Sequence, residues 1–211
     1  MDKLTAADVI AFLRVLAEEM PAHRDELREL DAQIGDGDLG ITISIGMKAI
    51  GDGLAELQAE EPGVILARSG MNFNRAAAST FGAIFATALM SAGKHIAGQA
   101  EIGAADLPDM LEAAASGVSA RGGAQPGEKT ILDVLLPMAE ALRADQEAAA
   151  SLPSAARVMH GACLEALERT KQMEAKHGRG GWLKEKSVGL PDPGATAICM
   201  MVEVFARFAA A

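Results

Sequence analysis

Apolar residues recur three or four positions apart along most of the chain, and this helical spacing constrains the fold more than any other feature. The first such segment begins after Thr5, a predicted N-cap, and ends at Pro21; its apolar residues are Val9, Phe12, Leu13, Leu16 and Met20. Aromatic residues make up only 3% of the sequence and Tyr is absent, so aliphatic side chains with high helix propensity must fill the interior. We therefore predict an all-α fold.

Further helices are expected along the whole chain. The predicted ranges are residues 22–30, 41–59, 62–97 as one or two helices, 104–120, 131–144 with a bend at Pro137, 154–176, and a final helix with Ile198, Met201, Val202, Phe205 and Phe208 on its buried face. The sequence contains no strand-period segment of useful length, no internal repeat and no break in composition. With 211 residues, half of them apolar, the chain can form one packed domain spanning residues 1–211, with about eight helices.

Charge and hydropathy exclude some partners and compartments. The formal net charge of -10, without a basic stripe, argues against nucleic-acid binding. The N-terminus lacks a basic region followed by an apolar run, and no 18 consecutive residues are apolar, so we predict a soluble, cytoplasmic protein without membrane contact. Cys163 and Cys199 lie in helical patterns without metal-ligand spacing and are predicted to be reduced core residues.

The loop DAQIGDGDLG carries three carboxylates within eight residues. Asp31, Asp36 and Asp38 would repel one another unless a hard cation lay between them, and the glycines of the loop allow the backbone to bring them together. We predict that they bind magnesium. An EF-hand is disfavoured because the Glu at loop position 12 and a third acidic position are missing. An acidic surface turn with capping aspartates is the other alternative.

A predicted helix follows the acidic loop directly. The free backbone N–H groups of Leu39, Gly40, Ile41 and Thr42 are expected to point at a phosphate that the metal bridges.

A second charged loop precedes the last helix. It contains Arg179, Lys184 and Lys186, and then Asp192-Pro193-Gly194. Asp192 is expected to cap the final helix, Gly194 and Ala195 to offer free N–H groups, and Arg179 to contact a phosphate. A solvated basic loop is the competing interpretation.

A third loop, RGGAQPGEKT, ends in a sequence that superficially resembles the end of a Walker A motif. The upstream glycine pattern is wrong and no strand precedes it, so a P-loop is excluded. The four histidines have neither ligand nor triad spacing, and no Ser lies in a G-x-S-x-G elbow, so the sequence gives no support for a hydrolase.

Three separated segments together resemble one family. LDAQIGDGDLG resembles the LDAxIGDGDHG signature of the dihydroxyacetone kinase L subunit, a unit also found as the C-terminal domain of single-chain dihydroxyacetone kinases. RGGAQPGEKTILDVLLPMAEAL is similar to the family's GDKTMLD segment, and GRGGWLKEKSVGLPDPGATA to its GRASYLGERSxGHxDPGA segment. With the helix at 78–93, the similarity covers essentially the whole chain in family order.

The resemblance implies a barrel of eight antiparallel amphipathic helices, with ADP or ATP and two Mg²⁺ ions bound among loops at one end. Asp31, Asp36 and Asp38 would hold the ions. The nucleotide would lie against the backbone from Leu39 to Thr42 and against residues from the other loops: Thr80, Phe81, Gly122, Ile131, Arg179, Asp192, Pro193 and Gly194.

The resemblance also implies a phosphotransferase of glycerol metabolism that acts only with a partner. A separate K subunit would bind dihydroxyacetone or a similar short ketose, such as a tetrulose, and this chain would donate the phosphoryl group. In some members ATP is consumed, whereas in others a resident ADP is rephosphorylated by a phosphoenolpyruvate-dependent phosphotransferase protein, the M subunit; both mechanisms and a homodimer are left open by the sequence.

Two departures from the family pattern bear on activity. Leu39 stands where the family usually has His, and the GGxSG segment reads ASTFG, so that Phe81 fills a Ser position. These changes fit a rival hypothesis, in which the chain is a nucleotide-sensing module that binds a transcription regulator or other partner without turnover. A third hypothesis is a helical interaction protein whose acidic loop is only a turn.

Overall fold

Helices form most of the chain in the computed structural model, which describes residues 2–145, 147–178 and 180–211. The α-helices are α1 (Ala6–Glu19), α2 (Arg24–Ile34), α3 (Leu39–Gly53), α4 (Pro62–Ala76), α5 (Thr80–His95), α6 (Leu107–Gly122), α7 (Leu132–Ala144), α8 (Leu152–Thr170), α9 (Gly180–Leu183) and α10 (Pro193–Ala210). Short 3₁₀ turns lie at Met20–His23, Leu54–Leu57, Ala104–Asp106, Ala148–Ala150 and Lys184–Ser187. The all-α prediction is confirmed.

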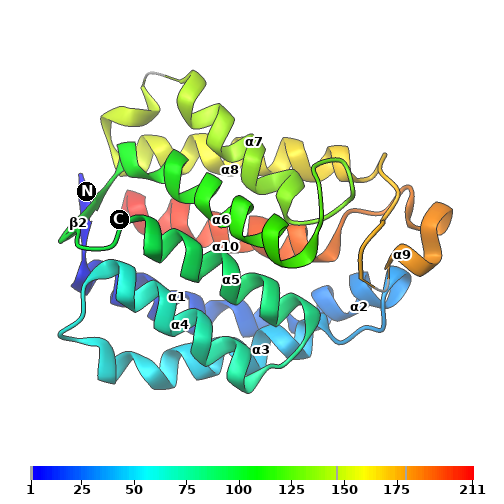
Figure 1. Cartoon of the computed structure of the whole chain (residues 1–211), viewed down its shortest axis with the longest axis horizontal. Helices are drawn as coiled ribbons and strands as arrows, with labels where there is room; N and C mark the ends of the chain where they lie inside the picture. Colours follow the sequence, from blue (N-terminus) through cyan, green and yellow to red (C-terminus); the bar gives the residue numbers. More distant parts are fainter. Residues whose placement is uncertain (1, 146, 179) are drawn as a thin grey trace.

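Eight of these helices close into a ring within the described residues. In the order α1, α3, α4, α5, α6, α7, α8 and α10, each helix packs against the next, and α10 packs against α1. Short connections reverse the chain direction, so every second loop lies at the same end of the barrel (Figure 1). Helices α2 and α9 lie at one end of the barrel, and both chain termini lie at the other (Figure 1). The predicted barrel of about eight antiparallel helices is confirmed.

The close contact between α4 and α5 depends on small residues. Gly63 of α4 and Gly93 of α5 face each other, and a Cβ added to either would overlap with the other's carbonyl oxygen. Two turns further along, a Cβ on Gly70 would lie 2.9 Å from the carbonyl oxygen of Ala86. The two backbones therefore approach more closely than larger side chains would permit.

Aliphatic and phenyl side chains fill the interior of the ring, as the composition predicts. The largest fully buried side chains include Met20, Leu27, Ile43, Met47, Ile65, Phe73 and Met138. Helix α10 is long and apolar enough to cross a membrane, but 56% of its 18 residues are buried inside the barrel. The core helix of a globular protein meets the same criterion, so the burial of α10 between its neighbours in the ring explains its apolar composition.

Several helix boundaries differ from the predicted ones. The capping box between Thr5 and Asp8 starts α1 as predicted, with the Thr5 amide donating to the Asp8 carboxylate at 2.9 Å. Helix α2, however, continues to Ile34, so that Asp31 belongs to its last turn rather than to the loop. The predicted segment 62–97 forms two helices, and α7 continues through Pro137.

A small sheet was not predicted. Strand β1 (Lys3–Thr5) pairs antiparallel with β2 (Glu101–Gly103), and it buries Leu4 against Ile102 at the end of the barrel that carries the termini. Each strand has only three residues, too few for a period of two to be recognised in the sequence.

The predicted state of the cysteines is wrong in the structure. Cys163 of α8 and Cys199 of α10 form a disulfide, with their Cα atoms 5.7 Å apart. The two helices are neighbours in the ring, and both cysteines face the core, so the bond links two buried faces. Their sequence separation of 36 gives no indication of this proximity.

We expect the disulfide to stabilise the barrel by constraining the unfolded chain. The Cys163→Ala/Cys199→Ala variant should lose about 2–4 kcal/mol of unfolding free energy in urea titrations, the range typical of a loop of this length. In the unreduced wild type, alkylation of the denatured chain should label neither cysteine. Labelling of both would show that the bond does not form in solution.

Candidate functional site

A cavity of about 530 Å³ opens at the end of the barrel where α2 and α9 lie, opposite the chain termini (Figure 1). Four connections that lie far apart in sequence supply its walls: α2 to α3, α4 to α5, α6 to α7, and α8 to α10. They meet because the alternating helix directions bring every second loop to this end (Figure 1). The volume is in the range of pockets for small molecules and cofactors.

The three predicted aspartates gather at the cavity wall. Asp31, Asp36 and Asp38 each offer a carboxylate oxygen, and these oxygens lie within 4.8 Å of one another. Asp31 is partly buried, whereas the other two are exposed. Gly35 permits this arrangement, because a Cβ at that position would overlap with the carboxylate of Asp31. Hard oxygen donors at this spacing fit Mg²⁺.

Fewer backbone amides in the first turn of α3 are free to bind a ligand than the sequence suggests. The amide of Leu39 donates to Asp31 Oδ2 at 3.2 Å, and the amide of Thr42 donates to the carbonyl of Asp38 at 2.9 Å. Leu39 lines the cavity, whereas Gly40, Ile41 and Thr42 are not among its lining residues. The expectation that all four amides are free is therefore wrong, because two of them already have acceptors within the protein.

Part of the cavity wall is largely apolar. Thr80 and Phe81 reach it from the start of α5, Gly122 from the end of α6, and Ile131 from the start of α7. The ring of Phe81 stacks on that of Phe85, with centroids 5.8 Å apart and an interplanar angle of 9°. This wall can accept a flat, apolar group.

Two charged residues of the α6–α7 loop belong to the site but were not predicted there. Lys129 lines the cavity although its side chain is almost fully buried, and burial lowers its pKa while the nearby Asp192 charge opposes this effect. Glu128 bonds to the ring of His177, another lining residue, at 2.5 Å, and this bond holds the pKa of Glu128 at about 2. Because 49 residues separate these partners, no local motif indicates the pair.

Asp192 begins α10 and lies where the last loop meets the cavity. Its carboxylate accepts from the Ala195 amide at 2.7 Å, so the predicted N-cap is confirmed. The expectation that the Ala195 amide is free is wrong, because the cap itself is its acceptor. Burial raises the pKa of Asp192 to about 7, and the Asp133 and Asp31 charges act in the same direction. The Ala195 hydrogen bond and the Lys129 charge oppose the rise.

The structure thus gathers most of the residues that the sequence predicts for the site. Those that line the cavity are Asp31, Asp36, Asp38, Leu39, Thr80, Phe81, Gly122, Ile131, Asp192, Pro193 and Gly194. Arg179 lies outside the described residues. Additional lining residues, among them Ser79, Ile84, Val118 and Ala124, were missed because small and apolar residues carry no chemical signature in a sequence.

The raised pKa of Asp192 predicts a pH dependence of stability. Between about pH 4 and pH 7 the folded protein retains a proton that the unfolded chain has lost, so this group makes stability fall as pH rises through that window. Asn at position 192 keeps the helix cap but cannot titrate. In urea unfolding with EDTA, the unfolding free energy of Asp192→Asn minus that of the wild type should increase from pH 5 to pH 8 by on the order of 1–3 kcal/mol. Asp52→Asn, on the exposed side of α3, is the control. A pH-independent difference would contradict the assignment.

Comparisons with known proteins identify relatives of this chain. Residues 33–207 match the DAK2 domain family. The chain is 30% identical over 203 residues to the ADP-binding subunit DhaL of the PEP-dependent dihydroxyacetone kinase of Escherichia coli, covering 96% of this chain and 97% of that subunit. It is also 34% identical to the L-erythrulose 1-kinase of Mycolicibacterium smegmatis, covering 94% of this chain but only 35% of the kinase.

Solved structures give the same fold. The native dihydroxyacetone kinase of C. freundii matches with a TM-score of 0.72 and 22% identity, over 95% of this chain and 34% of that chain. The same enzyme in complex with AMP-PNP and Mg²⁺ matches with a TM-score of 0.70 over 98% of this chain. On the family match and the full-length similarity to the E. coli subunit, the chain belongs to the DAK2 domain family.

Proposed function

We propose that this chain is the nucleotide-binding, phosphoryl-donating subunit of a kinase for dihydroxyacetone or a similar short ketose. The observation that carries the proposal is the cluster of Asp31, Asp36 and Asp38 at the wall of a 530 Å³ cavity. Full-length similarity to an ADP-binding kinase subunit supports it. In this proposal the whole chain, residues 1–211, is one cytoplasmic nucleotide-binding domain.

The three aspartates are the proposed ligands of Mg²⁺, with two ions in the complete site. Their separation fits oxygen-coordinated cations, and without a cation their charges would repel one another. When bound, Mg²⁺ would neutralise part of the negative charge of the phosphates. The backbone amide of Leu39 donates a hydrogen bond to the Asp31 carboxylate and so orients this carboxylate toward the cluster.

The remaining walls are proposed to hold ADP or ATP. Thr80, Phe81, Gly122 and Ile131 would contact the nucleotide at the apolar side of the cavity. Asp192, Pro193 and Gly194 would adjoin these residues at the start of α10, and Arg179 would contact a phosphate. Gly194 leaves this region open, since a Cβ there would lie 3.3 Å from Ile131 and 3.5 Å from Phe81. The backbone of Gly40, Ile41 and Thr42 would contribute through the dipole of α3 rather than through direct contact.

A partner must hold the ketose. Full-length erythrulose kinases are about three times as long as the region that they share with this chain, which leaves room in them for a ketose-binding part. We propose that a separate K-type subunit has this role here. Similarity to subunits of PEP-dependent kinases supports an M-type phosphotransferase partner that rephosphorylates resident ADP, with ATP as the alternative donor.

The nucleotide site is tested by titration calorimetry. ADP and ATP should bind to the wild type with Mg²⁺ and much more weakly with EDTA. Asp36→Ala should lower the Mg²⁺-dependent affinity by at least about tenfold, because even outer-shell changes at metal sites cost this much. Asp52→Ala, an exposed aspartate of α3 outside the cluster, should bind like the wild type. Equal affinity in Asp36→Ala and wild type would remove this residue from the metal site.

Turnover separates the kinase from a nucleotide-sensing module. The chain alone is expected to leave dihydroxyacetone unchanged, and addition of a K-type subunit with ATP, or with the phosphotransferase chain and phosphoenolpyruvate, should yield phosphorylated ketose. Magnesium-dependent nucleotide binding without turnover under either condition would favour the regulatory function.

A further inference from the structure

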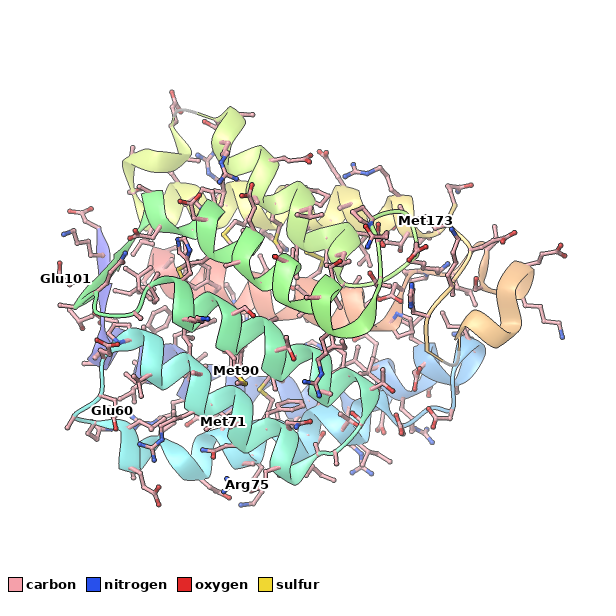
Figure 2. The ribbon with its side chains drawn as sticks, in the orientation of Figure 1. Glu60, Met71, Arg75, Met90, Glu101 and Met173 are labelled. Carbon is pink, nitrogen blue, oxygen red and sulfur yellow. A yellow bond between two sulfur atoms is a disulfide. The ribbon has the colours of Figure 1, made fainter. Side chains whose placement is uncertain are left out.

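The segment between α8 and α10 forms one wall of the cavity and has little regular structure of its own. This closing loop, residues 171–192, contributes Ala175, His177, Gly178, Gly180 and Asp192 to the lining. Among its described residues, 171–178 and 180–192, the helical parts are α9 and one 3₁₀ turn. Met173, near its start, lies toward the same end of the barrel as α2 and α9 (Figures 1 and 2). A wall of this kind needs fastening to the barrel if it is to hold its shape.

The side chain of Lys129 reaches from the α6–α7 loop into the closing loop. Its Nζ donates to the carbonyl oxygens of Met173 at 3.2 Å, Ser187 at 2.5 Å and Leu190 at 2.6 Å. An ammonium group has three protons, and these three acceptors use all of them. Lys129 is buried, with only 3% of the residue's surface exposed. Lys129 therefore ties together both ends of the loop.

The backbone at Lys129 shows that the residue is held in an unusual conformation. Its φ of 60° lies in the left-handed region, and no other described non-glycine residue has a positive φ. The carboxylate of Asp133 stabilises this turn by accepting from the amides of Gly127 at 2.5 Å and Thr130 at 2.8 Å. Glycine would adopt the same backbone conformation with less strain, so the backbone conformation does not account for a lysine here. The contacts of the lysine side chain do.

A second fastening lies beside the first. The carbonyl of Glu128 accepts from the amide of Lys176 at 3.2 Å, and its carboxylate bonds to His177. Within the loop, the amide of Ala175 donates to Ser187 Oγ at 2.9 Å. The turn at residues 127–130 and the closing loop thus form one hydrogen-bonded unit.

We propose that Lys129 is a positioning residue that fastens the closing loop against the turn at 127–130 and thereby shapes the nucleotide cavity. This rests on the function proposed above. A lysine at a phosphate site is usually expected to bind phosphate, but here the ammonium protons are directed at backbone carbonyls. Lys129 acts on the nucleotide through the loop that it holds.

The test uses Lys129→Met, which keeps the length of the side chain but removes its donors, in the full-length protein. Within the closing loop, the amide of Gly189 donates to the carbonyl of Lys171 at 2.7 Å. Hydrogen exchange should accelerate on the order of tenfold or more at the amides of Ala175, Lys176 and Gly189, with α4 and α5 unchanged. The affinity for ADP and for ATP with Mg²⁺ should fall by similar factors, about tenfold. Binding of Mn²⁺ to the aspartate cluster, measured without nucleotide, should stay within about twofold.

Two further variants keep the result interpretable. Ser187→Ala removes the acceptor for the Ala175 amide at the other end of the loop and should show the same pattern to a smaller degree, even if Lys129→Met unfolds. Lys48→Met, an exposed lysine of α3, should match the wild type.

The outcomes are distinct. Unchanged hydrogen exchange at the three amides in both loop variants would overturn the proposal. A loss of ATP affinity in Lys129→Met far greater than the loss of ADP affinity would also overturn it, because it would identify Lys129 as a direct phosphate ligand. Accelerated exchange in a protein whose wild type binds no nucleotide would support the fastening role and contradict the proposed function instead.

Discussion

Close helix packing is the constraint on which the rest of this molecule depends. At Gly63 and Gly93 the backbones of α4 and α5 meet without intervening side chains, and small residues continue this contact at Gly70. Each helix of the ring is held between two neighbours, and an Arg207–Glu19 ion pair accompanies the contact between α10 and α1. Because the ring closes in alternating directions, four loops converge at one end and form the cavity.

Negative charge is concentrated where those loops meet. The aspartate cluster lies on one side of the cavity, and Asp192 lies on another with a pKa raised by burial and by neighbouring carboxylates. Within the described part of the chain, the buried cation beside Asp192 is Lys129, whose protons are engaged by the closing loop. The site therefore has the electrostatics of a cation-binding centre with a polar loop fastened over it.

Much of the fold and part of the site could be predicted from local patterns. Helical spacing indicates the barrel helices, and the capping positions of Thr5 and Asp192 are correct. The aspartates were found because they lie within eight residues of one another, so a short motif contains the whole cluster. The extension of α2 to Ile34 was missed, because the glycines that follow made the entire segment resemble a loop. The amides of α3 were misjudged, since their acceptors depend on side-chain geometry.

By itself, the sequence determined the all-helical class, the main capping residues and the position of the acidic loop, because spacing and residue chemistry within about ten positions encode them. Only the tertiary structure decided which distant residues meet. Cys163 bonds to Cys199 across 36 residues, Glu128 meets His177 across 49, and Lys129 reaches carbonyls 44 to 61 residues away. These contacts depend on how the helices pack around the ring, and a packing distance between remote segments has no periodic signature in the chain.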